Sequence, residues 1–198
     1  MERYKATQIA QWFINRASMD AIMFDGEYVT NLKLQKLLFY AQGLSLAMYN
    51  SPLFSEEIQA WMHGPVVKQI YQKYNVCKGN SIEDVQPVEI DIETAKFLEL
   101  VYRRYGKYTG AELRNMSHLQ NSYKNNYMEN ERNVRIPQKD ILKDFVDEKE
   151  ALLSEFKQKE LELADFAETC YVSSIKNLKD QVEDDSFETV EVDWKNEL

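Results

Sequence analysis

The feature that most constrains the fold is a run of helical spacing over residues 31–49, bounded on both sides by residues that break helices. Thr30 suits the N-cap, because its hydroxyl can accept a hydrogen bond from a free amide of the first turn. Ser51-Pro52 ends the run, since proline cannot continue a helix and restricts the residue before it. The residues that share one helical face at three- and four-residue spacing are Leu34, Leu37, Leu38, Ala41, Leu44, Ser45 and Met48. The run predicts an amphipathic helix, and the polar residues it turns away from that face are Lys33, Lys36 and Gln42.

The rest of the first 146 residues predicts more helices and a short β ribbon. Helical spacing or capping signals begin at residue 7 (through about 18), Gly64-Pro65, Asp91 (to Gly106), Thr109 and Pro137. Residues 57–61 alternate as a strand does, and residues 133–136 could pair with them. Residues 120–132 are polar and predict a loop with one helical turn. The expected fold is mainly α, a compact multi-helix domain over residues 1–146 with a two- or three-stranded β ribbon.

The composition shifts beyond residue 147. Residues 148–179 contain no Gly or Pro and keep a rough helical seam, which predicts a long amphipathic helix. Residues 180–198 hold eight acidic side chains and one basic one, a net charge of −7, whereas the whole chain carries −9. Large apolar side chains are interspersed among these acids, at Phe187, Val190, Val192 and Trp194. We therefore expect a second region, residues 147–198, whose acidic tail either docks on a partner or packs back on its own domain.

Charge and hydropathy exclude several classes of partner. The first 179 residues carry a net charge of only −2 and lack the basic footprint that nucleic-acid binding needs, unless Lys33, Lys36, Lys68 and Lys73 gather into a patch. No apolar run reaches the length of a membrane span, and residues 1–5 lead into an amphipathic stretch rather than a signal peptide. The expectation is a cytoplasmic protein that contacts no membrane, and oligomerisation stays open.

The residues with catalytic chemistry are few. His63 and His118 could form a metal or acid–base pair, but the favoured interpretation is that they hydrogen-bond within the fold. No cluster of His, Cys or Glu has the spacing of a metal site, and no glycine-rich phosphate loop occurs. Trp61 is either an exposed anchor for a partner or, as favoured here, a core residue. The sequence therefore predicts no enzyme, no cofactor and no metal.

Three motifs stand close together in residues 30–67. The first runs from Thr30 through Leu32, Lys33, Leu34, Gln35, Lys36, Leu37, Leu38 and Tyr40 to Ala41. The second is Pro52-Leu53-Phe54, and the third is Ala60-Trp61 followed by Gly64-Pro65-Val66-Val67. Together they closely resemble the SocA-like antitoxin, or Panacea, domain of bacteria and phages, over about residues 7–145. Where that family has Thr-His followed by a tryptophan, this chain has Ser117-His118 and then Tyr123.

The resemblance implies most of the expected function. Proteins of this family resemble antitoxins that neutralise a toxin, usually encoded by the adjacent gene, through direct protein–protein binding. The alternatives are a proteolytic adaptor that delivers the toxin to a AAA+ protease, and a phage- or prophage-encoded regulatory binding protein. The family-motif residues, expected to be mostly structural, are Leu34, Gln35, Lys36, Leu37, Leu38, Tyr40, Trp61, Gly64, Pro65 and His118. The residues expected to bind the toxin are His63, Asp184, Asp185, Phe187, Val190, Val192 and Trp194.

Overall fold

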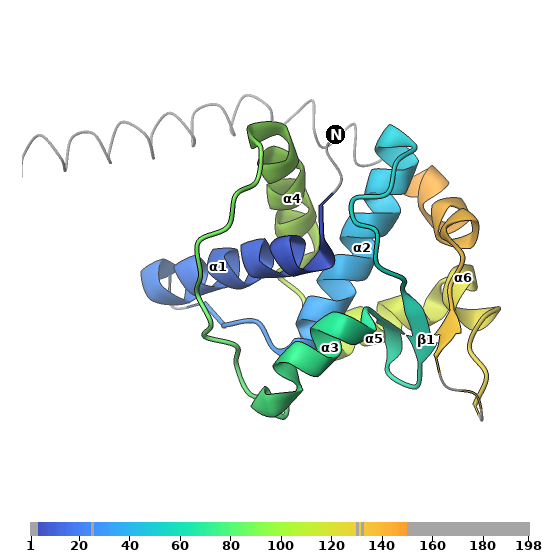
Figure 1. Cartoon of the computed structure of the whole chain (residues 1–198), viewed down its shortest axis with the longest axis horizontal. Helices are drawn as coiled ribbons and strands as arrows, with labels where there is room; N and C mark the ends of the chain where they lie inside the picture. The colour runs from blue at the N-terminus through green and yellow to red at the C-terminus, as the bar shows by residue number, and fades with distance from the viewer. Residues whose placement is uncertain (1–3, 25, 130, 132, 150–198) are drawn as a thin grey trace, which may run out of the picture. The chain divides into compact units, whose positions relative to one another are not determined.

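The computed structural model describes residues 4–24, 26–129, 131 and 133–149, and these form helices around one central helix. The central helix is α2 (Asn31–Tyr49), which contacts α1 (Ala6–Phe24), α3 (Lys68–Tyr74), α4 (Ile92–Tyr105) and α5 (Gly110–Leu119). In Figure 1, α1 and α4 lie on one side of α2, and a small sheet and the helix of residues 138–149 lie on the other. The expectation of a mainly helical fold is confirmed.

The boundaries predicted for α2 are confirmed, but the prediction that it is amphipathic, with one polar face toward solvent, is wrong. Thr30 caps the helix, its hydroxyl accepting a hydrogen bond from the Lys33 amide, and Asn50 ends it in the left-handed conformation. Sixteen of its nineteen residues are buried, among them Lys33, Lys36 and Gln42, which were expected on a polar face. A helix with neighbours on every side has no solvent face, so its polar residues are enclosed with its leucines.

The other helices follow the sequence signals with one difference in length. Asp91 accepts a hydrogen bond from the Thr94 amide at the start of α4, and Thr109 and Glu112 form the capping box of α5. The short α6 (Asn121–Lys124) is the helical turn expected within the polar loop. Helix α1 was predicted to end near residue 18 and instead continues to Phe24. Its last turn therefore extends beyond the part of the helix that packs in the core.

Three short strands form an antiparallel sheet in the order β2–β1–β3. The strands are β1 (Gln59–Trp61), β2 (Gly64–Val66) and β3 (Val134–Arg135), and Ala60 lies opposite both Pro65 and Val134. The expected pairing of the first strand with residues 133–136 is confirmed. The expectation that Gly64-Pro65 starts a helix is wrong, because both lie in β2 and α3 begins at Lys68. Proline is tolerated there because β2 is an edge strand.

The helix of residues 138–149 closes the core against α2. Phe145 is fully buried, and its ring occupies the place where a Cβ on Gly43 would lie, so only glycine permits this approach. A short 3₁₀ turn, η1 (Asn75–Cys77), follows α3. Apart from residues 147–149, the second region expected from residue 147 onward lies outside the described residues, and so do the long helix over 148–179 and the acidic tail.

Candidate functional site

Two glutamines of α2, the motif residue Gln35 and the nearby Gln42, each bind the backbone of a different loop. Gln35 accepts a hydrogen bond from the Val67 amide at 2.9 Å and donates to Asn31 at 3.0 Å. Gln42 accepts from the Leu53 and Phe54 amides at 2.9 and 3.1 Å and donates to the Phe54 carbonyl at 3.1 Å. A buried amide side chain must satisfy both its donor and its acceptor, and both glutamines do so. In each case the side-chain oxygen accepts from backbone amides outside α2.

Lys36 lies between these two glutamines and binds the β1–β2 hairpin. Its side chain is fully buried, and Nζ donates to the Pro65 carbonyl at 2.8 Å. Gly64 has φ +93°, and a Cβ built on it would lie 2.8 Å from Lys36 Nζ and 2.7 Å from Ser117 Oγ. Burial lowers the pKa of Lys36 to about 7, and the positive charge of Arg114 acts in the same direction. This ammonium group is therefore enclosed by the protein and acts within the fold.

His118 and Tyr123 continue the cluster from α5 and α6. Their rings stack with centroids 4.5 Å apart, and the Tyr123 hydroxyl donates to the Trp61 carbonyl at 2.9 Å. His118 Nε2 is buried and has no hydrogen-bond partner among the described residues. Burial, followed by the charge of Lys36, lowers the pKa of His118, so the imidazole is neutral at pH 7.

Four of the predicted motif residues thus meet at the hairpin, namely Lys36, Gly64, Pro65 and His118. We call these four residues, together with Ser117 and Tyr123, the hairpin cluster. Other motif residues lie elsewhere in the core, namely Leu34, Leu37, Leu38 and Tyr40. The Tyr40 ring stacks on Tyr105, and its hydroxyl is buried without a hydrogen-bond partner among the described residues.

Trp61 and His63 are less buried than the cluster. The expectation that Trp61 is a core residue is wrong, because it is only partly buried, with its ring edge-on to Tyr71 at 5.0 Å. His63 is exposed in the hairpin turn. The other residues expected to bind the toxin lie outside the described residues: Asp184, Asp185, Phe187, Val190, Val192 and Trp194.

Sequence reasoning missed a charged cleft on the other side of α2. Its cavity volume is about 370 Å³, and the residues that line it are Arg16, Asp20, Gly26, Glu27, Lys33, Tyr102, Arg103, Gly106 and Lys107. Arg16 donates to Glu99 at 2.7 Å, and Arg103 donates to the same carboxylate at 2.9 Å. Lys33 differs from both, because its ammonium group forms no ion pair or hydrogen bond within the described part of the chain although the residue is only 8% exposed. The spacing of apolar residues predicted only that Lys33 lies off the apolar face of α2. Nothing in the local sequence predicts that Glu99 lies beside Arg16.

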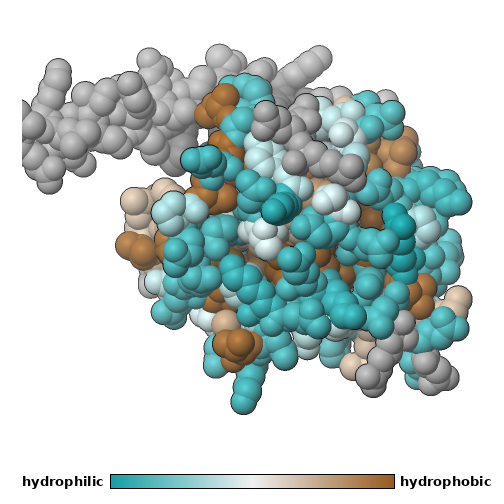
Figure 2. Space-filling view, viewed as in Figure 1, coloured by the Kyte–Doolittle hydropathy of each residue, from teal (hydrophilic) through white to brown (hydrophobic). Residues whose placement is uncertain are grey.

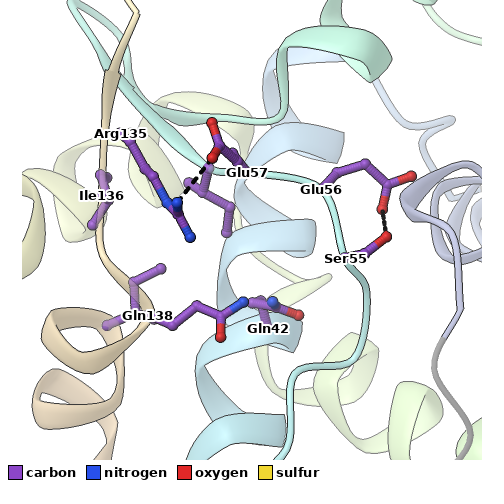
Figure 3. Close-up of a pocket in the computed structure, with 9 residues that line it drawn as sticks. Gln42, Ser55, Glu56, Glu57, Arg135, Ile136 and Gln138 are labelled. Atoms are coloured by element: carbon purple, nitrogen blue, oxygen red, sulfur yellow. Dashed lines mark hydrogen bonds and ion pairs between the residues drawn. The ribbon is translucent and has the colours of Figure 1, made fainter.

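A second, smaller hollow lies where β3 meets the chain before β1 (Figure 3). Arg135 forms an ion pair with Glu57 at 2.9 Å across it, and the amides of Gln42 and Gln138 lie below that pair. Its volume of about 10 Å³ is roughly that needed for one water molecule. It is too small for an organic ligand.

The described residues show neither a cluster of metal ligands nor a membrane-spanning helix. They contain no group of three His, Cys, Asp or Glu side chains that could hold a metal ion. None of their helices combines the length and the apolar character required to cross a bilayer. Lys33 and Lys36 are buried, whereas Lys68 and Lys73 are exposed on α3, so the four lysines do not gather into one basic patch.

Comparison with known families identifies the part of the chain that contains the hairpin cluster. Residues 34–124 match the family described as antitoxin SocA-like, Panacea domain. The match begins within α2 and ends with α6, and it excludes α1. No curated protein and no solved structure matches the chain. Over residues 34–124 the chain is therefore similar to the SocA-like antitoxin family and its Panacea domain.

Proposed function

We propose that this protein is an antitoxin that neutralises a protein toxin by binding it directly and catalyses no reaction. The observation that carries the proposal is the family match over residues 34–124. The polar residues of α2 are consistent with it, because Gln35, Lys36 and Gln42 are all engaged by backbone groups of the fold. A binding protein needs a rigid scaffold and a free surface, and these residues supply the scaffold.

The toxin is expected to be encoded by the adjacent gene. The test expresses the product of the neighbouring reading frame in a host, alone and together with this protein, and measures growth. Growth arrest by the neighbouring product and rescue by this chain are the expected results. Purified toxin should then lose activity in proportion to added antitoxin, reaching full inhibition at a fixed molar ratio. Inactivation by far less than one equivalent would contradict the proposal, because it would require turnover.

Two alternatives differ in what happens to the toxin. An adaptor would deliver the toxin to a AAA+ protease, and a regulatory binding protein would leave it active. Following toxin half-life in cells, with and without this protein, separates them. Direct neutralisation predicts an unchanged or longer half-life, because the bound toxin is shielded. A half-life shortened by this protein and restored by deleting the protease would favour the adaptor.

A further inference from the structure

The end of α1 carries an unusual group of exposed apolar side chains. Met19, Ile22, Met23 and Phe24 are 50, 74, 65 and 70% exposed, although Ile9, Phe13 and Ile14 on the same helix are fully buried. We call these four residues the α1 tip. Apolar atoms are visible at the surface where α1 ends, at the left of Figure 2. A contiguous group of exposed apolar side chains on a globular protein marks a contact surface for another molecule.

The charged cleft lies beside the α1 tip. Asp20 and Gly26 both line it, and the Gly26 amide donates to the Asp20 carbonyl at 3.1 Å, so the chain turns back at the end of α1. The tip and the cleft therefore belong to one surface. It includes α1 and Lys33, which precede the matched segment, and residues 102–107 within that segment.

Lys33 gives this surface its electrostatic character. Four basic and two acidic side chains line the cleft, and Arg16 is held by both Glu99 and Asp20. Burial lowers the pKa of Lys33, whereas the carboxylates of Glu27, Asp20 and Glu112 favour its charged form without forming an ion pair with it. Lys33 is only 8% exposed as a residue, it lines the cleft, and its ammonium group has no partner among the described residues, so it is available to pair with a carboxylate from outside the fold.

We propose that the α1 tip and the Lys33 cleft together form the surface that binds the toxin. In the complex, a carboxylate of the toxin lies in the cleft against Lys33, and an apolar hollow of the toxin covers the tip. This rests on the proposed antitoxin function. A protein fits better than a small anion, which would leave the tip exposed. It also fits better than an anionic membrane, because Lys33 lines a cleft and does not lie on a flat basic surface.

The test measures the dissociation constant of the purified neighbouring-gene toxin for the full-length protein and its variants. Ile22→Ser with Phe24→Ser, the tip variant, replaces the two most exposed of the four tip side chains without disturbing the core. Lys33→Met removes the charge but keeps the apolar stem. Val76→Ser, at a side chain 79% exposed on η1, is the matched apolar control, and Lys96→Met on α4 is the matched charge control. Thermal unfolding of each variant verifies that it is folded.

The tip variant and Lys33→Met should each weaken binding by roughly 30-fold or more, as loss of an interface hot spot or of one member of a desolvated charge pair does. Both controls should change binding by less than about twofold, as expected for side chains outside an interface. Binding should also weaken with salt more steeply in the wild type than in Lys33→Met.

Three results would overturn the proposal, and they can be told apart. Wild-type affinity in both the tip variant and Lys33→Met would place the toxin elsewhere while leaving the antitoxin function intact. Binding of the wild type to phosphatidylcholine vesicles containing phosphatidylglycerol, lost in the tip variant, would assign the tip to a membrane. A neighbouring product that is not toxic, or does not bind the wild type, would remove the proposed function and this surface with it.

Discussion

Two lysines three residues apart on α2, Lys33 and Lys36, are both nine-tenths or more buried, yet only one of them has a hydrogen-bond partner for its ammonium group within the described residues. Lys36 Nζ donates to the Pro65 carbonyl and lies against Gly64, so it completes the packing of the β1–β2 hairpin. Lys33 lines an open cleft beside the α1 tip and has no ion pair within the described part of the chain. Burial alone therefore does not distinguish a structural charge from one available to a partner. The presence or absence of a partner within the fold does.

The largest expected effect tests the tight packing on the Lys36 side. Gly64→Ala should lower the free energy of unfolding by about 2–4 kcal/mol, because the new Cβ meets Lys36 Nζ and Ser117 Oγ in a left-handed backbone. Gly79→Ala is the matched control, since Gly79 has φ +97° but nothing within 4 Å of its Cβ position, and should cost only about 1 kcal/mol. Chemical denaturation measures both. Equal losses would mean that backbone strain, rather than contact with Lys36, decides the outcome.

The second prediction concerns the pH dependence that Lys36 confers. Its pKa is about 7 in the folded protein and near 10.5 in the unfolded chain, so between these values the unfolded state binds one more proton. The stability of the wild type relative to Lys36→Met should therefore rise with pH above about 7, by at most about 1.4 kcal/mol per pH unit, and stay constant below it. Urea unfolding of both proteins at pH 6, 7, 8 and 9 gives this difference. A difference independent of pH would contradict a buried, titrating Lys36.

Tyr123→Phe tests the other contact that fixes the hairpin. The change removes the hydrogen bond to the Trp61 carbonyl and keeps the ring stacked on His118, so it should cost about 1 kcal/mol of unfolding free energy. Tyr108→Phe, at a partly buried tyrosine outside the β1–β2 hairpin, is the control and should be close to neutral. A Tyr123→Phe variant as stable as the wild type would mean that the Tyr123 hydrogen bond does not help to hold the hairpin and that Lys36 does.

The smallest effect on stability is expected at Lys33. Lys33→Met removes a mostly buried charge that has no partner in the described fold, so the free energy of unfolding should stay within about 0.5 kcal/mol of the wild type or rise. Thermal and urea unfolding at pH 7 measure the change. A loss comparable to that of Gly64→Ala would show that Lys33 is structural, and the contrast between the two lysines would disappear.

The sequence predicted what depends on local chemistry. The cap at Thr30, the capping box at Thr109 and Glu112, and the stop before Pro52 act within one turn of chain, and all are found where expected. The roles of Lys33 and Lys36 were not predictable in this way, because hydropathy spacing assigns polar residues to solvent and cannot show that helices cover α2 on every side. Pro65 was misassigned for a related reason, since a proline can start a helix or lie in an edge strand, and only tertiary pairing with β1 decides between them.

Helix α2 uses Lys36 for the fold, and we propose that it uses Lys33 for a partner. The dissociation constant of the neighbouring-gene toxin for Lys33→Met, taken with the unfolding free energy of the same variant, separates the two roles. If Lys33 pairs with the toxin, binding should weaken by roughly 30-fold while stability stays unchanged. Wild-type affinity in a folded Lys33→Met protein would contradict that pairing.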